Sequence, residues 1–321
     1  MTTNPLRELV HRGQSVWLDQ LRRDWLTDGT MARWIEDDGV RGLTSNPSIF
    51  AWAITNSDCY DEQTADLAVA GREAEAIYDK LTVDDIRAAC QLLLPVYKAT
   101  SGADGYVSHE VSPELARDTW GTIHEARRLW RAIDRPNVMI KIPATPEGMP
   151  AIEKALGEGI NINVTLLFSL SQYEAVTEAH AAGLEARHGT GRDISTLASV
   201  ASFFVSRVDT KVDAALQRRL AALSTVDGAE AEALEGLLGK AAVANALRAY
   251  SRYQAYAASD RFAALEAVGA RKQRVLWAST STKNPDYSDV KYVEELVAPD
   301  TVNTLPLKTL EAFRDHGRVT A

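Results

Sequence analysis

Lys141 has the surroundings in this sequence that most clearly suggest chemistry. It lies inside the apolar segment 137–145, which reads NVMIKIPAT. An apolar run of this length between turn signals is typical of a strand buried on both faces. Burial disfavours the charged form of a lysine, and an uncharged lysine can attack a carbonyl carbon to form a Schiff base. The alternative is a structural lysine whose stem packs inside while its ammonium reaches water.

Two carboxylates end other strand-like runs. Glu110 lies at the end of the segment 105–111, and Asp19 directly follows the segment 15–18. Either carboxylate could exchange a proton with water or with a substrate. The alternatives are a salt bridge from Glu110 to a lysine and a helix-capping role for Asp19. His109 takes the opposite face of its strand, toward the helices, and we interpret it as structural.

Polar and apolar residues alternate along the segment 160–166. Because side chains of a strand point alternately to its two faces, Asn161, Asn163 and Thr165 are expected to face one way together. The apolar set, which would face the helices, is Ile160, Ile162, Val164 and Leu166. Polar side chains inside a barrel need hydrogen-bond partners or ligands. The segment therefore predicts either a binding site or an internal hydrogen-bond network.

Two cations follow later strand-like runs and are suited to bind phosphate. Arg207 comes just after the segment 197–204, and a guanidinium can hold phosphate through two parallel hydrogen bonds. Lys283 lies in the hydroxyl-rich loop 279–285, and barrels often bind phosphate after their last two strands. The alternatives are a surface salt bridge for Arg207 and a solvated turn for the loop. Asn46, which precedes a proline, could simply start a helix.

Strand-like and helix-like segments alternate along the whole chain, which predicts parallel strands joined by helices. The expected strands are 15–18, 40–44, 105–111, 138–142, 160–166, 197–204, 274–278 and 301–305. The expected helices are 21–25, 57–70, 72–98, 112–133, 146–156, 169–188, one from 208, 229–265 and 307–314. Eight strands are the number that closes a (β/α)₈ TIM barrel. A doubly wound open sheet is less favoured, because no G-x-G-x-x-G motif follows the first strand.

Composition excludes several classes of protein. The chain has 321 residues, of which 45% are hydrophobic and 25% charged, as in a globular protein. A net charge of −9 argues against general nucleic-acid binding. Cys59 and Cys90 form no C-x-x-C pair, so neither a disulfide framework nor a zinc site is indicated. The sequence shows no apolar signal segment and no membrane span, so we expect a cytoplasmic protein.

Six motifs, in the order found in the family, resemble the transaldolase family. Their residues are most similar to those of its longer bacterial branch found in actinobacteria. They are VWLD at 16–19, TSNPSIF at 44–50, MIKIPAT at 139–145, GININVTLLFS at 159–169, VASFFVSRVD at 200–209 and AST at 278–280. The resemblance implies a single (β/α)₈ barrel of the class I aldolase type over residues 1–321, with a C-terminus that is short for the family. It also implies an enzyme without metal or organic cofactor.

The reaction that the resemblance implies is transfer of a dihydroxyacetone unit in the non-oxidative pentose phosphate pathway. The donor would be sedoheptulose 7-phosphate or fructose 6-phosphate, and the acceptor glyceraldehyde 3-phosphate or erythrose 4-phosphate. Lys141 matches the Schiff-base lysine of the family. Asp19 matches the group that takes the proton of the C4 hydroxyl. Glu110 and Thr165 match the pair that holds the catalytic water.

Substrate-binding residues are implied in the same way. Asn46, Asn163 and Ser202 match the residues that bind the dihydroxyacetone hydroxyls. Arg207 matches a phosphate-binding arginine. Lys283 stands where many relatives carry a second arginine, and it supplies the charge without the bidentate geometry.

Several alternatives remain open at this level. One is a transaldolase-like aldolase that releases free dihydroxyacetone, or a specialised enzyme acting on another sugar phosphate through the same lysine. Another is an inactive barrel that only binds sugar phosphates, although Lys141, Asp19 and Glu110 are all present. The sequence fixes neither the substrate preference nor whether the protein is a monomer or a homodimer. His109 and Trp120 depart from the family pattern and receive no role.

Overall fold

Eight parallel strands form a closed barrel in which each strand pairs with the next and β8 pairs with β1. The computed structural model describes residues 4–223 and 228–319. The predicted (β/α)₈ barrel is therefore confirmed. Its strands are β1 Gln14–Leu18, β2 Val40–Thr44, β3 Tyr106–Glu110, β4 Val138–Pro143, β5 Ile162–Leu167, β6 Ser199–Phe204, β7 Arg274–Ala278 and β8 Thr301–Leu305.

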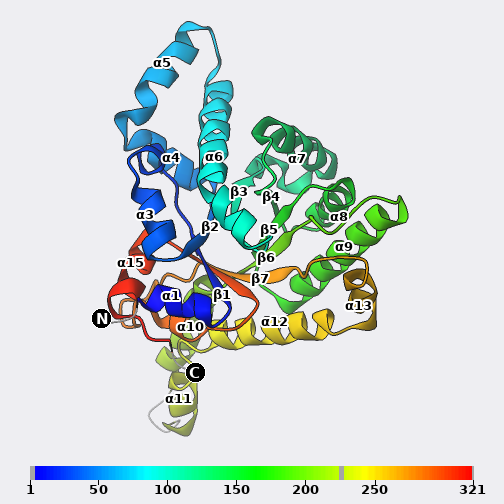
Figure 1. Cartoon of the computed structure of the whole chain (residues 1–321). Coiled ribbons are helices and arrows are strands. Elements are labelled where there is room, and N and C mark those ends of the chain that lie inside the picture. The colour runs from blue at the N-terminus through cyan, green and yellow to red at the C-terminus, as the bar shows by residue number, and fades with distance from the viewer. Residues whose placement is uncertain (1–3, 224–227, 320–321) are drawn as a thin grey trace.

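Helices surround this barrel, and the α5–α6 pair extends well beyond its rim (Figure 1). The helices are α1 Pro5–His11, α2 Arg23–Thr27, α3 Thr30–Asp37, α4 Pro47–Thr55, η1 Asp58–Tyr60, α5 Asp61–Val69, α6 Ala74–Ala99, η2 Pro113–Arg117, α7 Thr119–Ile133, α8 Gly148–Glu158, α9 Leu170–Gly189, α10 Ser206–Ala221, α11 Gly228–Glu235, α12 Ala241–Ala257, α13 Asp260–Glu266, α14 Lys291–Glu294 and α15 Leu307–His316. No helix within the described ranges is long and apolar enough to span a membrane.

Alternation along the strands separates a packed end of the barrel from a polar end. Large side chains including Trp17, Tyr106 and Met139 form one buried cluster. Asp19 lies two residues after Trp17 and Lys141 two residues after Met139, so both share the inward face at the carboxyl end of the barrel. Gly42 makes room for the large cluster, because a Cβ at this position would lie 2.4 Å from ring carbons of Trp17.

A buried carboxylate joins several segments at the amino end of the barrel. Asp104 accepts hydrogen bonds from the hydroxyl of Ser15 at 2.6 Å and from the indole of Trp17 at 3.3 Å. It also pairs with Arg274 at 2.9 Å. These bonds satisfy the buried charge and tie β1 and β7 to the loop before β3. Barrel enzymes carry their sites at the opposite, carboxyl end of the strands.

Some predicted boundaries were wrong. The helix predicted at 112–133 is interrupted, since η2 ends at Arg117 and α7 begins after Asp118, whose side chain caps it. The helix predicted at 229–265 is three helices, α11 to α13, and residues 224–227 before it lie outside the described part. Asn161 precedes β5, and its side-chain amide donates hydrogen bonds to the backbone oxygens of Pro136 and Val138. Residues 1–3 and 320–321, on which the expectations for the two chain ends partly fall, also lie outside the description.

Candidate active site

A cavity of about 430 Å³ opens at the carboxyl ends of the strands. It brings together residues from all eight strands or the loops that follow them, so residues far apart in sequence meet there. Every predicted site residue except Asn163 lines it, namely Asp19, Asn46, Glu110, Lys141, Thr165, Ser202, Arg207 and Lys283. Asn163 is fully buried. Eight of the nine residues predicted for the site therefore line one cavity.

Lys141 lies at the bottom of the cavity and is 7% exposed. Its Nζ is 3.1 Å from Oε2 of Glu110 and donates a hydrogen bond of 3.1 Å to the backbone oxygen of Ser45. The register of β3 and β4 causes this contact, because Glu110 and Lys141 are paired across the two strands. The salt bridge considered as an alternative for Glu110 is thus present. This contact places a proton acceptor directly beside the amine of the lysine.

Asp19 follows β1 and belongs to a chain of hydroxyl groups. Its carboxylate accepts a hydrogen bond of 2.6 Å from Thr44, whose hydroxyl is 2.6 Å from that of Thr304. Burial raises the pKa of Asp19 above its ordinary value, while Lys141 and Thr44 lower it by smaller amounts. Asp19 does not cap α2, because the N-cap of that helix is Arg22. The capping alternative was therefore wrong.

Asn163 is the centre of a buried hydrogen-bond chain below the cavity. Its amide donates to the hydroxyl of Ser108 at 2.9 Å, and its oxygen accepts from Ser202 at 2.7 Å. This confirms that Asn163 faces the barrel interior. Asn46 caps α4, since its side-chain oxygen accepts from the backbone N–H of Ile49 at 3.0 Å. Asn46 therefore starts a helix and also lines the cavity.

The two predicted phosphate ligands lie at the rim of the cavity. Arg207 is in the first turn of α10, with its guanidinium carbon 5.1 Å from the centre of the Phe204 ring. No carboxylate in the described part of the chain forms an ion pair with Arg207, so the salt-bridge alternative has no support there. Lys283 is exposed and donates a hydrogen bond of 2.7 Å to the hydroxyl of Ser281. Two cations at the rim of one cavity suit an anionic ligand.

Two residues at the rim have left-handed backbone conformations, which are unusual outside glycine. Leu166 has a φ of 63° and Ser279 a φ of 55°. The pairing of β5 with β6 shifts register between Val164 and Leu167, so Leu166 bulges out of the strand. The prediction that Leu166 faces the helices was wrong, because its side chain is 38% exposed and lines the cavity. Backbone strain of this kind is often concentrated at functional sites.

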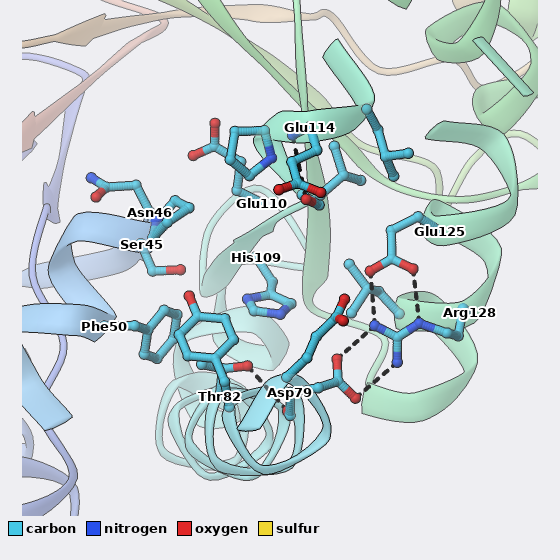
Figure 2. Close-up of a pocket in the computed structure, with 18 of the residues that line it drawn as sticks. Ser45, Asn46, Phe50, Asp79, Thr82, His109, Glu110, Glu114, Glu125 and Arg128 are labelled. Atoms are coloured by element: carbon cyan, nitrogen blue, oxygen red, sulfur yellow. Dashed lines mark hydrogen bonds and ion pairs between the residues drawn. The ribbon is translucent and has the colours of Figure 1, made fainter. Parts of the chain in front are cut away.

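A second and larger cavity, of about 740 Å³, lies beside the first between α4, α6 and α7 (Figure 2). The two share Asn46, Pro47, Glu110 and Pro113 in their walls. One side is held by Arg128, which pairs with Asp79 at 2.6 Å and with Glu125 at 2.8 Å. No lysine is among the described residues that line the larger cavity, in contrast to the smaller one.

His109 lies at the inner end of the larger cavity (Figure 2). It is 5% exposed, and its ring lies edge-on to Phe50 at 5.7 Å. Burial lowers the pKa of His109 to about 4. The predicted orientation away from the barrel interior is confirmed. Trp120, in contrast, is 67% exposed at the start of α7.

The hydrogen bonds around Asp19 and Lys141 involve residues that received no role from the sequence. Thr44 donates to the carboxylate of Asp19, Thr304 contacts the hydroxyl of Thr44, and Ser45 supplies a backbone oxygen to Lys141. A signal for Thr304 was available, because it lies two residues after Val302 and so shares its inward face. No sequence pattern marks the backbone oxygen of Ser45.

The fold and the cavity define a barrel enzyme with a buried lysine at the carboxyl end of its strands. A family model described as Transaldolase/Fructose-6-phosphate aldolase matches residues 16–321, and the chain belongs to this family. A transaldolase of Thermobifida fusca is 54% identical over 317 residues, covering 99% of this chain and 83% of the relative. A transaldolase of Mycolicibacterium smegmatis is 51% identical, covering 100% of this chain and 84% of the relative. One of Trichodesmium erythraeum is 49% identical, with 98% and 83% covered.

Proposed function

We propose that the protein transfers a dihydroxyacetone unit between sugar phosphates through a Schiff base on Lys141. The donor is sedoheptulose 7-phosphate or fructose 6-phosphate, and the acceptor is glyceraldehyde 3-phosphate or erythrose 4-phosphate. The expected setting is the non-oxidative pentose phosphate pathway in the cytoplasm. The observation that carries the proposal is the cavity in which Lys141 meets Glu110 and is joined in the lining by Asp19 and two cations, Arg207 and Lys283. Membership of the family supports it.

The first step is attack of the Lys141 amine on the C2 carbonyl of the donor. The ammonium must lose a proton before it can attack, and Glu110 at 3.1 Å is in range to accept it. A water molecule then leaves as the carbinolamine becomes an imine. Glu110 and Thr165 line the cavity next to the lysine and are assigned to hold this water.

Cleavage of the C3–C4 bond needs a base for the C4 hydroxyl proton. Asp19 is the second carboxylate of the cavity, and its raised pKa brings it closer to neutral pH, where proton exchange is most efficient. The electron pair of the broken bond passes into the protonated imine, and the aldose phosphate leaves. When the acceptor aldehyde arrives, the same bond re-forms and Asp19 returns the proton. Water then releases the new ketose from Lys141.

The residues assigned to bind the donor lie in two places, inside the barrel and at the rim of the cavity. Asn46 and Ser202 line the cavity, and Asn163 lies below it with its amide toward Ser108, so these polar groups are assigned to the hydroxyls of the dihydroxyacetone unit. Arg207 and Lys283 at the rim are assigned to the phosphate. Hydroxyl recognition inside and phosphate recognition outside would place the C2 carbonyl near Lys141.

A second candidate is an aldolase that releases free dihydroxyacetone, because the description of the matching family covers both activities. The two are separated by incubating the protein with fructose 6-phosphate, with and without erythrose 4-phosphate. The proposal predicts that glyceraldehyde 3-phosphate accumulates beyond one equivalent of enzyme only when the acceptor is present. Continuous release of dihydroxyacetone without acceptor would favour the aldolase.

A further inference from the structure

The loop between β7 and α14 carries Lys283 at the rim of the lysine cavity. Ser281 and Thr282 are half-buried, and Lys283 itself is exposed. A lysine on an unsupported loop would lose much of its binding energy in becoming ordered around a ligand. Structural features that hold this loop in place therefore bear directly on how the rim binds an anion.

Two buried aspartates of α10 hold that loop. Asp209 and Asp213 are 1% and 6% exposed, and their spacing of four residues places them on the same face of the helix. Asp213 accepts a hydrogen bond of 2.8 Å from the hydroxyl of Tyr287 near the end of the loop. Asp209 accepts one of 2.8 Å from Tyr292 in α14. Two tyrosines thus attach the loop and the following helix to α10.

Backbone groups complete the coordination of the two carboxylates. The N–H of Gly239 donates to Asp213 at 3.0 Å, and the N–H of Ala242 donates to Asp209 at 2.6 Å. Each buried carboxylate therefore has one tyrosine and one backbone donor. Buried charges need such partners, which makes the arrangement a fixed connection and not a chance surface contact.

Both tyrosines stay protonated at neutral pH and so remain hydrogen-bond donors. Burial and the neighbouring Asp213 raise the pKa of Tyr287 to about 12. Burial and Asp209 also raise the pKa of Tyr292.

The same helix carries the other rim cation. Arg207 is in the first turn of α10, where the backbone N–H of Ser206 also donates to the oxygen of Ser279 at 3.0 Å. The loop is thus attached to α10 at its start by Ser279 and near its end by Tyr287. A small cavity of about 150 Å³ lined by Asp213, Lys283 and Tyr287 shows that Lys283 lies next to this attachment.

We propose that the Tyr287–Asp213 and Tyr292–Asp209 contacts are positioning devices that hold Lys283 beside Arg207 for the phosphate of the substrate. Neither tyrosine lines the lysine cavity, so neither is a catalytic residue. The inference rests on the proposed function for the identity of the substrate. It adds residues whose effect is confined to the phosphate end of the site.

The test compares Tyr287→Phe with the wild type, using Tyr250→Phe as the matched control. The hydroxyl of Tyr250 likewise donates one hydrogen bond, to the backbone oxygen of Pro299 at 3.0 Å, and Tyr250 likewise lies outside the lysine cavity. Its partner Pro299 does not belong to α10. In Tyr287→Phe we expect KM for fructose 6-phosphate and Kd for inorganic phosphate, measured by calorimetry, to rise about three- to tenfold. We expect kcat to stay within about twofold, because the reacting groups are untouched. Borohydride trapping of dihydroxyacetone, which has no phosphate, should half-saturate at the wild-type concentration.

Several outcomes would overturn the inference. These are an unchanged phosphate Kd in a folded Tyr287→Phe, a parallel loss of dihydroxyacetone trapping, or the same KM change in Tyr250→Phe. If Tyr287→Phe does not fold, Asp213→Asn replaces it, because its amide oxygen can still accept from Gly239 while its nitrogen cannot accept from Tyr287. The phosphate titration needs no turnover. A wild type that binds phosphate but traps no substrate would therefore contradict the proposed function while leaving the positioning test intact.

Discussion

Replacing His109 by phenylalanine tests whether this histidine is structural, as its place on the outer face of β3 indicates. Its Nδ1 is buried and makes no hydrogen bond within the described residues, so a ring without nitrogen loses no partner there. Phenylalanine has nearly the same shape, and the 740 Å³ cavity next to the ring leaves room for it. We therefore expect His109→Phe to be about as stable as the wild type at pH 7 and to keep its kcat within about twofold.

At lower pH the two proteins should differ. Burial lowers the pKa of His109 from 6.5 to about 4, an effect larger than those of Asp79, Glu125 and Arg128 around it. Below pH 6.5 the unfolded chain binds a proton at this position that the folded chain does not bind until about pH 4. Unfolding is therefore favoured as the pH falls, and the wild type should lose about 2 kcal/mol of stability between pH 7 and pH 5 from this residue alone.

Urea denaturation followed by tryptophan fluorescence measures this difference. The unfolding free energies of wild type and His109→Phe are determined at pH 7, 6 and 5. The variant should become the more stable protein as the pH falls, since other buried groups, including His180, titrate equally in both. If the two curves stay parallel, His109 is not buried in neutral form. A large loss of kcat at pH 7 would instead show that it takes part in the reaction.

Further substitutions test the other parts of the account. Asp19→Asn should lower the transfer rate by about 100-fold or more, because the base for the C4 hydroxyl proton is lost. Burial raises the pKa of Asp19, so its ionised form lowers the stability of the folded protein above that pKa. The variant should therefore also melt about 2 °C higher than the wild type at pH 8. Arg207→Ala should raise KM for fructose 6-phosphate by about tenfold in steady-state assays, and Lys283→Ala by less, because a lysine makes no bidentate contact; equal KM values in wild type and both variants would remove the phosphate assignment. Gly42→Ala should lower the unfolding free energy by about 2–4 kcal/mol in urea, because its Cβ would overlap the ring of Trp17, and an unchanged midpoint would refute that packing.

Local patterns predicted the barrel well because strands and helices alternate along the sequence. The segments 40–44, 274–278 and 301–305 match β2, β7 and β8 in full, and Lys141 was placed correctly inside β4. The motif residues meet in one cavity because the carboxyl ends of barrel strands converge.

Other features depend on contacts between distant segments and so leave little trace in the sequence. The alternation along β5 predicted that Leu166 faces the helices. Its real orientation follows from a register shift in the pairing of β5 with β6, which the sequence does not show. Thr304 could have been found from its parity with Val302. The carbonyl oxygen of Ser45 beside Lys141, and the attachment of Tyr287 to Asp213, arise only once the chain is folded.

The central claim is that Lys141 is the nucleophile, and borohydride reduction in the presence of fructose 6-phosphate tests it most directly. Intact-mass and peptide analysis should show one dihydroxyacetone unit fixed on the peptide that contains Lys141. The adduct should be absent from Lys141→Ala and unchanged in Lys154→Ala, a matched control at an exposed lysine that pairs with Glu158. Absence of any adduct in the wild type, or an adduct that survives Lys141→Ala, would contradict the account.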